Sequence, residues 1–411
     1  MLRSLRILTL TGLVLAVSAC GGKQKGNSNA PGGGGGGDDR TTRLNDARNE
    51  TLIGLANEDL AVGKHAKARQ RAEDALAIDK NNPDAYAVIG AADFRAGNFE
   101  SSSNAYREAL EIKPDHYGAL IGLAGNLQAE GKHDEALVMA EKAGSDATQM
   151  WPKVRQLSSL YALADFDKAQ PVVDAIFKFE VEKTILPVIQ LKQTFVNAFA
   201  GKGPMIQVEG AKGSSDLQID TATGFKHIGA AVGGEFKRAI LFEVREEARV
   251  DAGLAKQLKL PSLGKVKLVG QEAELDLVLI PEIKIGEMTI KNIPAIAEDL
   301  SAYAGIGEVP GLVLGRQFMQ RFGAITFNFP EGSSEFVVAP PAAKPNGSFE
   351  APFILIDALT VLIPVTKTQL DDSDHAFYTW FGGVFLASST SVSRRAYLKS
   401  GHLPRELEEL D

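Results

Sequence analysis

Residues 227–261 read HIGAAVGGEFKRAILFEVREEARVDAGLAKQLKLP, and this stretch decides how the second half of the chain is interpreted. It opens with alternating apolar residues, which predict a half-buried strand. The pair Gly233-Gly234 predicts a tight turn. Residues 239–242 then predict a second, apolar strand, and residues 255–260 predict a short helix.

The same pattern extends over the region that follows Pro204, where short segments of alternating apolar and polar residues are separated by glycine turns. Such a pattern is typical of a β-rich domain. We expect strands at residues 205–209, 216–220, 228–232, 239–244, 274–280, 283–285, 288–290, 324–329 and 335–338. Further along, residues 311–319 read GLVLGRQFM, an apolar run that ends at Gly315 before a predicted helix.

The order of strand, turn, apolar strand, loop and short helix resembles the first half of an aspartic-protease lobe of the retropepsin or pepsin kind. The GLVLGRQFM stretch resembles the second signature of that family. The resemblance covers residues 205–340 and implies a mostly-β acid-protease barrel. Residues 359–365 and 387–393 resemble parts of a second, shortened copy, which amounts to half a lobe at best.

Catalysis in that family depends on two Asp-Thr-Gly loops. Two close carboxylates cannot both ionise, so one acts as acid and the other as base on a shared water. Aligned on the turn and the helix, the Asp position of the first copy falls on Phe242. The second copy has no Asp between Asp374 and Asp411. The resemblance therefore implies a domain that has lost catalysis.

Asp220 leaves an alternative open. Residues 217–223 read LQIDTAT, which resembles the catalytic motif with Ala222 in place of its glycine. Under this alternative the protein is an active aspartic endopeptidase, and a symmetric dimer supplies the second carboxylate. Asp251 is a weaker candidate, because acidic residues precede it instead of an apolar strand.

The first half of the chain carries a different signal, a repeat of 34 residues marked by Gly63, Gly97 and Gly131. Small residues recur at the same spacing. The period and the pattern resemble the tetratricopeptide repeat, a pair of antiparallel helices. We expect repeats at residues 49–82, 83–116 and 117–150, a degenerate fourth at 151–184, and a closing helix at 184–200.

Repeat arrays of this kind usually bind peptides or partner proteins in a concave groove. The family's groove positions fall on Asn57, Ala87, Ala91, Phe94, Arg95, Ile121 and Gln128. Among them, Asn57, Phe94, Arg95 and Gln128 are the predicted partner-binding residues. The Lys/Asn clamp that some members use for a terminal carboxylate is not matched, since Gly54, Val88 and Gly122 stand where Asn is expected. An alternative is that the repeats pack onto the following domain and bind nothing else.

The N-terminal residues predict export and lipidation. Residues 1–19 combine two arginines with a short apolar run, as in a secretory signal. Cys20 is the single cysteine and follows a lipobox-like Val-Ser-Ala, so we expect a lipid anchor there. The glycine-rich residues 20–40 predict a flexible tether. We expect the protein in a bacterial envelope, at the outer membrane and facing the periplasm.

Composition excludes several other functions. The net charge is −8 and no basic run is interleaved with aromatic residues, which argues against nucleic acid binding. The six histidines lack metal-ligand spacing and no phosphate-binding glycine loop is present, so neither a metal nor a cofactor is expected. The sequence thus predicts a multidomain protein, with an α-helical tetratricopeptide solenoid at 41–200, an aspartic-protease-like β lobe at 201–345 and a partial second lobe at 346–411. Two other functions stay open, the active endopeptidase and a purely structural envelope lipoprotein.

Overall fold

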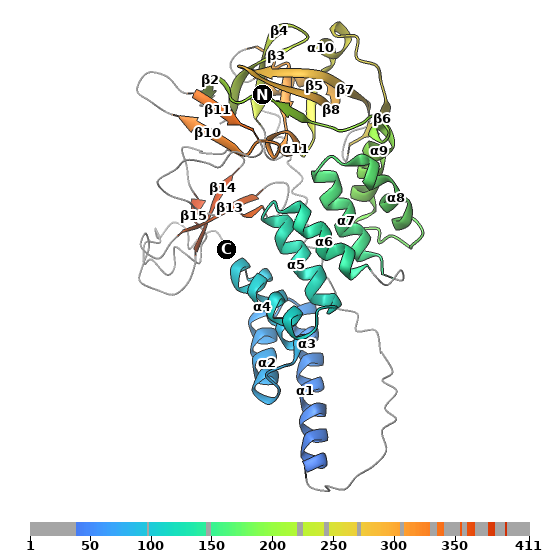
Figure 1. Cartoon of the computed structure of the whole chain (residues 1–411), viewed down its shortest axis with the longest axis vertical. Helices are drawn as coiled ribbons and strands as arrows, with labels where there is room; N and C mark the ends of the chain where they lie inside the picture. Colours follow the sequence, from blue (N-terminus) through green and yellow to red (C-terminus); the bar gives the residue numbers. More distant parts are fainter. Residues whose placement is uncertain are drawn as a thin grey trace, which may run out of the picture. The chain divides into compact units, whose positions relative to one another are not determined.

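The computed structural model describes residues 38–96, 98–144, 149–219, 225–241, 246–268, 273–304, 308–328 and 335–340, and the backbone of four later strands. Cys20, Gly97, Asp220 and Phe242 lie outside the described residues. In the described part, helices come first and a β domain follows, which confirms the predicted order (Figure 1).

The helical part is a series of helix pairs. Its helices are α1 (Asp38–Ala61), α2 (His65–Ile78), α3 (Pro83–Arg95), α4 (Phe99–Ile112), α5 (Tyr117–Ala129), α6 (His133–Ala143), α7 (Trp151–Ala162), α8 (Phe166–Ile176) and α9 (Leu186–Phe199). Each predicted repeat corresponds to one pair, except that α1 begins at Asp38, before the predicted first repeat and inside the predicted tether, and α9 lies at the predicted closing helix. Asn82 begins the second pair, because its side chain accepts hydrogen bonds from the amides of Asp84 and Ala85.

The turns inside the pairs follow the repeat. Gly63 and Gly131 have φ angles of 77° and 74°, a left-handed conformation that glycine adopts without a steric penalty. In the degenerate fourth repeat the corresponding residue is displaced by one position, to Ala164, which has a φ angle of 48°. The one-residue shift seen in the sequence therefore preserves the geometry of the turn at some conformational cost.

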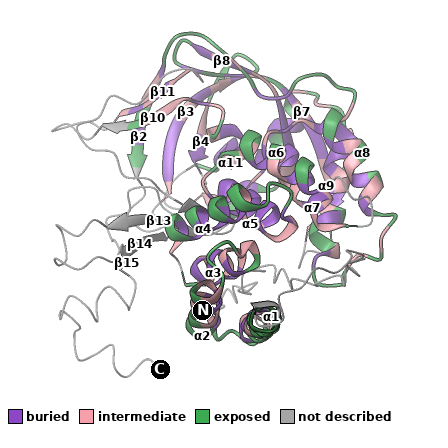
Figure 2. Ribbon diagram, turned by 60° about the horizontal axis from the view of Figure 1, so that its bottom comes forward, coloured by how far each residue is buried: buried purple, intermediate pink, exposed green. Residues whose placement is uncertain are grey.

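Small residues let the helices approach each other. Ala56 and Ala124 are fully buried, and a Cβ added to Gly90 would lie 2.7 Å from Cε1 of Tyr106. Figure 2 shows buried residues on the inward sides of these helices and along the strands of the β domain. The repeated small residues are thus explained by packing alone, without any reference to function.

The β domain of the described residues is one large sheet that closes on itself. Its strands are β1 (Gln207–Glu209), β2 (Gly213–Ile219), β3 (Lys226–Val232), β4 (Glu235–Leu241), β5 (Ala248–Asp251), β6 (Gly264–Lys267), β7 (Glu274–Ile285), β8 (Met288–Glu298), β9 (Leu312–Leu314), β10 (Ala324–Asn328) and β11 (Glu335–Ala339). The ring runs β3-β4-β9-β5-β8-β7 and returns to β3. Closure leaves no free edge within the ring, whereas β10 and β6 end the sheet outside it.

The most buried strands of the barrel include the parallel pair β4–β9. In this pair Ala239 is aligned with Leu312, and Leu241 with Leu314. Residues 239–241 and 312–314 are all buried, as parallel strands covered on both faces require. The predicted Gly233-Gly234 turn is confirmed, with φ angles of 59° and 83° between β3 and β4.

Three details differ from the sequence prediction. The strands predicted at 274–280 and 283–285 form a single strand, β7, because Pro281 falls at an unpaired position opposite Asn292, where no ladder amide is needed. The helix predicted at 255–260 is α10 (Ala252–Gln257), which begins earlier because the side chain of Asp251 caps it. The short strands β5 and β6 were not predicted.

The chain divides into two compact units. The first contains residues up to Gln128 and Asp134–Arg155, and the second contains Ala129–His133 and everything from Gln156. The second unit therefore includes most of α7, all of α8 and α9, and the barrel. Later in the chain, β12 (Ile354–Leu355), β13 (Thr360–Val365), β14 (Phe377–Gly382) and β15 (Ser391–Val392) form a separate sheet. Within the part that the structure describes, no helix has the length and hydrophobicity needed to cross a membrane.

Candidate functional site

The predicted partner-binding residues lie on the first helix of each pair. Asn57 is on α1, Phe94 and Arg95 are at the end of α3, and Gln128 is near the end of α5. All four are partly exposed, whereas the predicted groove residue Ile121 is fully buried. Phe94 packs edge-to-face on Phe99 with ring centroids 5.4 Å apart. Ile121 therefore serves the core and is not accessible to a partner.

Gln128 is held by a residue that the sequence did not single out. Its side-chain amide donates to the carbonyl of Arg155 at 2.8 Å, and its Oε1 accepts from Nη1 of Arg155 at 3.0 Å. This reciprocal pair joins α5 to α7 across the repeat. Arg155 lies in the degenerate fourth repeat, where the pattern was too weak to identify functional positions.

Tyr106 of α4 was also missed. A Cβ on Gly122 would lie 2.1 Å from its Cζ and 2.5 Å from its hydroxyl oxygen. The two glycines of α3 and α5 therefore leave the space that this ring fills. We call Tyr106, Gln128, Arg155 and Arg95, whose charge acts on Tyr106, the Tyr106 cluster. A comparison of the repeats could have found it, since Tyr106 aligns with Ala72 in the preceding repeat and so needs extra room.

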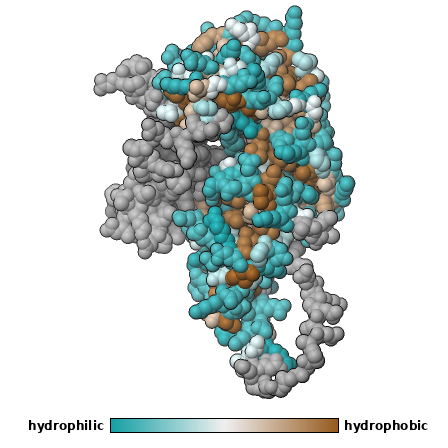
Figure 3. Space-filling view, in the orientation of Figure 1, coloured by the Kyte–Doolittle hydropathy of each residue, from teal (hydrophilic) through white to brown (hydrophobic). Residues whose placement is uncertain are grey.

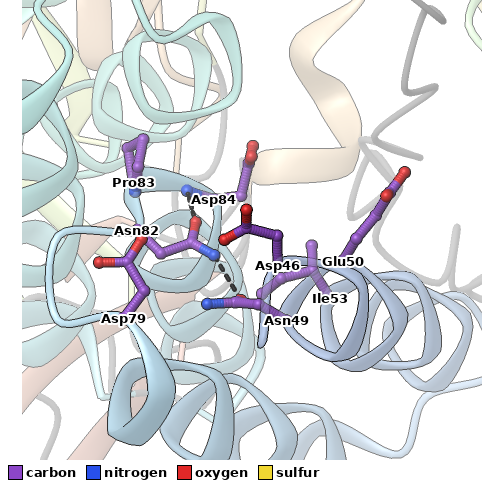
Figure 4. A pocket seen from close by; sticks show the side chains of 8 residues that line it. All are labelled: Asp46, Asn49, Glu50, Ile53, Asp79, Asn82, Pro83 and Asp84. Atoms are coloured by element: carbon purple, nitrogen blue, oxygen red, sulfur yellow. Dashed lines mark hydrogen bonds between the residues drawn. The ribbon is translucent and has the colours of Figure 1, made fainter. Parts of the chain in front are cut away.

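A pocket of about 320 Å³ lies at the start of the array (Figure 4). Its lining residues are Asp46, Asn49, Glu50, Ile53, Asp79, Asn82, Pro83 and Asp84. The amide of Asn82 donates to Asn49 at 2.6 Å, and Asp84 is bound by His116 at 2.9 Å. The hydrogen bond from His116 lowers the pKa of Asp84. The first of these hydrogen bonds lies within the first repeat and the second lies within the second repeat, while Asn82 also caps α3.

Hydrophobic residues also reach the surface of the helical part between more hydrophilic ones (Figure 3). Leu44, Val62 and Val138 are among the exposed large apolar side chains. They lie on α1, on the turn after it and on α6, so they do not form one continuous patch along a single helix. Scattered apolar residues of this kind are normal on a protein surface and carry no functional conclusion.

In the barrel, the position expected for a catalytic loop follows β4. Leu241, the last residue of β4, pairs with Lys226 on one side and with Leu314 on the other. After the undescribed residues 242–245, the carbonyl of Glu246 accepts a hydrogen bond from the amide of Gln317 at 3.0 Å. Glu246 is thus tied to the segment that follows Gly315.

Asp220, the alternative catalytic residue, lies outside the described residues. The strand before it, β2, pairs with β3 and β11, and is separated from β9 by β3 and β4. Adjacent strands are about 4.8 Å apart, so the end of β2 is roughly 14 Å from β9 along the sheet. Asp251, the weaker candidate, is the cap of α10 and accepts from the amides of Gly253 and Leu254 at 2.9 and 3.1 Å.

Helices of the second unit cover the segment that follows the catalytic-loop position. The hydroxyl of Tyr161 on α7 donates to Glu247 at 2.8 Å, and Nζ of Lys192 on α9 lies 3.3 Å from Glu246. The same Nζ is 4.1 Å from the centre of the Tyr161 ring. We call Tyr161, Lys192, Glu246, Glu247 and Arg249 the Tyr161 cluster.

Other contacts complete this cluster. The amide of Gln317 donates to the carbonyl of Tyr161 at 2.6 Å, and Arg249 forms an ion pair with Glu298. Tyr161 is 0% exposed and Arg249 is 1% exposed. Charges in such a setting are tolerated only when each has an opposite partner.

The electrostatics of the Tyr161 cluster follow from burial and from these partners. Burial raises the pKa of Tyr161, and the charges of Glu247 and Glu246 raise it further, so the hydroxyl stays a hydrogen-bond donor. Burial alone would raise the pKa of Glu246, but the ammonium of Lys192 and the guanidinium of Arg316 outweigh it and the pKa is lowered. Glu246 is therefore held as a carboxylate within an ionic contact.

No group of three or more potential metal ligands occurs within the described ranges. No family model matches the sequence. No curated protein sequence matches it either.

Several solved structures are similar to parts of the chain. The Pseudomonas aeruginosa protein PilF is 17% identical over 37% of this chain and 69% of its own, with a TM-score of 0.33. The tetratricopeptide protein TTC0263 of Thermus thermophilus is 15% identical over 38% of this chain and 84% of its own, with a TM-score of 0.32. A retropepsin-like aspartic protease from Rickettsia conorii is 17% identical over 34% of this chain and 98% of its own, with a TM-score of 0.23.

Proposed function

We propose that the chain is an envelope protein whose helical repeats bind a protein or peptide partner, and whose barrel is not catalytic. The observation that carries the first part is the position of Phe94 and Arg95. They end the first helix of the second pair, are partly exposed, and Arg95 forms no ion pair with any described residue. An aromatic ring beside an arginine is the composition that protein interfaces favour.

Photo-crosslinking in living cells tests partner binding. A benzophenone amino acid placed at Phe94 of the full chain should crosslink to discrete partners in the bacterium that makes the protein. The same amino acid at Glu108, an exposed position of α4, is the matched control. Equal crosslinking at both positions, or none at Phe94, would refute binding by the repeats.

The absence of catalysis is supported by the Tyr161 cluster. Two carboxylates can share one water only if both loops face each other across open space. In this chain the residues that follow the loop position, Glu246 and Glu247, are engaged by Lys192 and Tyr161 of the chain's own helices. A second copy approaching along this segment would have to displace these buried contacts.

A proteolysis assay tests this part of the proposal. The full chain should not hydrolyse casein or a peptide library between about pH 3 and 7, the range in which aspartic dyads work. Asp220→Ala should leave that result unchanged. Hydrolysis that a transition-state-mimicking aspartic-protease inhibitor blocks, and that Asp220→Ala abolishes, would establish the endopeptidase instead.

We also propose that Cys20 carries the lipid anchor, which rests on the sequence pattern alone. Labelled fatty acid should appear on the wild-type protein and not on Cys20→Ser. Equal label on both proteins would refute the lipidation.

A further inference from the structure

The Tyr106 cluster contains hydrogen-bond donors that the fold does not use. The Tyr106 ring is 6% exposed, wedged between Gly90 and Gly122 of the neighbouring helices. Its hydroxyl forms no hydrogen bond with any residue in the described part of the chain. The hydroxyl oxygen itself is not fully buried, so it can reach water or a ligand.

Arg155 also has a hydrogen-bond donor that no described residue uses. Its Nη1 bonds to Gln128, but its Nε is buried without a hydrogen-bond partner. Its Nη2 lies against α5, 2.8 Å from where a Cβ on Gly125 would stand. Among the described residues, no carboxylate pairs with this guanidinium. A half-buried arginine without a counterion is unusual, because removing its charge from water is costly.

Arg95 adds a second guanidinium without an anionic partner within the described ranges. It lies in the last turn of α3, where the helix dipole favours a cation and so helps to tolerate it. The nearest acidic residue in sequence, Asp93, is not available, because Arg69 pairs with it at 3.0 Å and Ser101 donates to it at 2.5 Å.

The charges of Arg95 and Arg155 both affect the pKa of Tyr106. Burial raises the pKa of Tyr106, whereas the charges of Arg155 and Arg95 oppose that rise. Arg95 also contributes, after burial, to a lowered pKa of His65 at the start of α2. The charge of Asp93 acts on Tyr106 in the opposite direction, but the carboxylate of Asp93 is already paired with Arg69.

We propose that Arg95, Tyr106 and Arg155 bind the carboxylate of an aspartate or glutamate side chain in an extended segment of the partner protein. The guanidiniums supply charge-assisted N–H donors and the phenol supplies an O–H donor, which together match the acceptors of one carboxylate. Phe94, on the same turn as Arg95, offers an apolar surface to the neighbouring side chain of the segment. This inference rests on the proposed partner binding and specifies its chemistry.

This site differs from the terminal-carboxylate clamp that the sequence excludes. The clamp requires Asn at the positions of Gly54, Val88 and Gly122, whereas the proposed donors come from the end of α3, from α4 and from α7. We take an internal acidic side chain as the ligand, because the Asn positions of the terminal-carboxylate clamp are not matched here.

Binding of two labelled octapeptide pools to the full chain, purified in detergent, tests the proposal. Both pools have amidated ends and random flanks, with Asp or Glu at the two central positions in one and Asn or Gln in the other. The acidic pool should bind roughly ten- to a hundredfold more tightly, the range expected for hydrogen bonds to a charged group. Arg95→Gln, Arg155→Gln and Tyr106→Phe should each reduce that preference.

Arg107→Gln is the matched control, because Arg107 is an exposed neighbour of Tyr106 on α4 and its removal changes net charge equally. It should retain the full preference. Tyr106→Phe keeps the buried ring, so a lost preference in that variant reports the hydroxyl and not misfolding, provided that its circular dichroism is unchanged.

The outcomes separate the two proposals. If both pools bind equally, the carboxylate site is wrong while partner binding stands. If neither pool binds and Phe94 gives no crosslink, both are wrong. A neutral pool with a free C-terminal carboxylate is the third arm, and tighter binding of that pool than of the amidated acidic pool would overturn an internal side chain as the ligand.

Discussion

The Tyr106 cluster and the Tyr161 cluster each place a tyrosine beside basic side chains, but only the Tyr161 cluster also contains carboxylates that pair with them. In the second, Lys192 faces Glu246, Tyr161 donates to Glu247, and Arg249 pairs with Glu298. In the first, Tyr106 and Arg155 lie against Gly122 and Gly125 of α5, and no described carboxylate forms an ion pair with Arg155 or Arg95, although the charge of Asp93 also acts on Tyr106. A compensated cluster, in which each charge has an opposite partner, stabilises the fold. An uncompensated cluster, in which charges lack such partners, lowers stability, and its presence is better explained by the binding of a ligand.

The largest expected effect comes from breaking the compensated cluster. Arg249→Met should destabilise the barrel by about 3–5 kcal/mol, because it removes the buried guanidinium that pairs with Glu298. Chemical denaturation followed by circular dichroism measures this. Lys265→Met is the control, since the Lys265–Asp276 pair is exposed and worth at most about 1 kcal/mol. Equal losses in both variants would show that the Tyr161 cluster is not a buried ionic core.

A smaller effect is expected from filling the space around Tyr106. Gly122→Ala would place a Cβ 2.1 Å from the ring, so we expect a loss of about 1–3 kcal/mol from overpacking. Gly54→Ala has nothing within 4 Å and should instead stabilise α1 by about 0.5–1 kcal/mol. Thermal unfolding compares the two. A neutral Gly122→Ala would mean that the ring is free to move and that the cluster is not preformed.

Acid should weaken the Tyr161 cluster selectively. The pKa of Glu246 is below its ordinary value of 4.5, so its contribution to stability is complete above that pH and is lost as the pH falls through the folded pKa. Glu246→Gln should therefore be less stable than wild type at pH 7 and show a flatter loss of stability below pH 4.5. Melting temperatures of both proteins over this range measure the difference, and parallel curves would contradict it.

The smallest effect on stability should come from the uncompensated cluster. Arg95→Gln removes a charge that no described carboxylate pairs with, so the free energy of unfolding should change by less than about 0.5 kcal/mol. Denaturant titration of the full chain checks this alongside the peptide assay. A loss above about 1 kcal/mol would indicate a structural partner and would weaken the comparison between the clusters.

The repeat architecture could be predicted from sequence because its signals are local. The turns are marked in the sequence by Gly63, Gly131 and Ala164, although the turn residue of the fourth repeat is displaced by one position. The barrel strands were predicted from alternation, but β5 is too short to show a pattern between Glu247 and the Asp251 cap.

The clusters could not be predicted in the same way. Tyr161 and Glu247 are 86 residues apart, and Tyr161 and Gln317 are 156 apart. Contacts of this kind depend on which helix packs on which strand, and no periodicity in the sequence records that. Among the expected partner-binding residues, Gln128 could be proposed from the repeat, but its partner Arg155 comes from the repeat with the weakest pattern.

The junction between α9 and β1 affects where domains of this chain can be exchanged with those of other proteins. Residues 201–204 read Gly-Lys-Gly-Pro and look like an interchangeable linker, yet the structure fixes them at several points. The amide of Gly201 is bound by Asp167, the carbonyl of Pro204 accepts from Asn292, and the buried Ile206 bonds to Asn292 with a φ angle of 49°. A chimera joined here would keep Asn292 with the barrel but would lose Asp167, which accepts the hydrogen bond from the amide of Gly201. The transferable module is the barrel together with Gln156 and all that follows, so recombination would carry these last helices with the barrel as one piece.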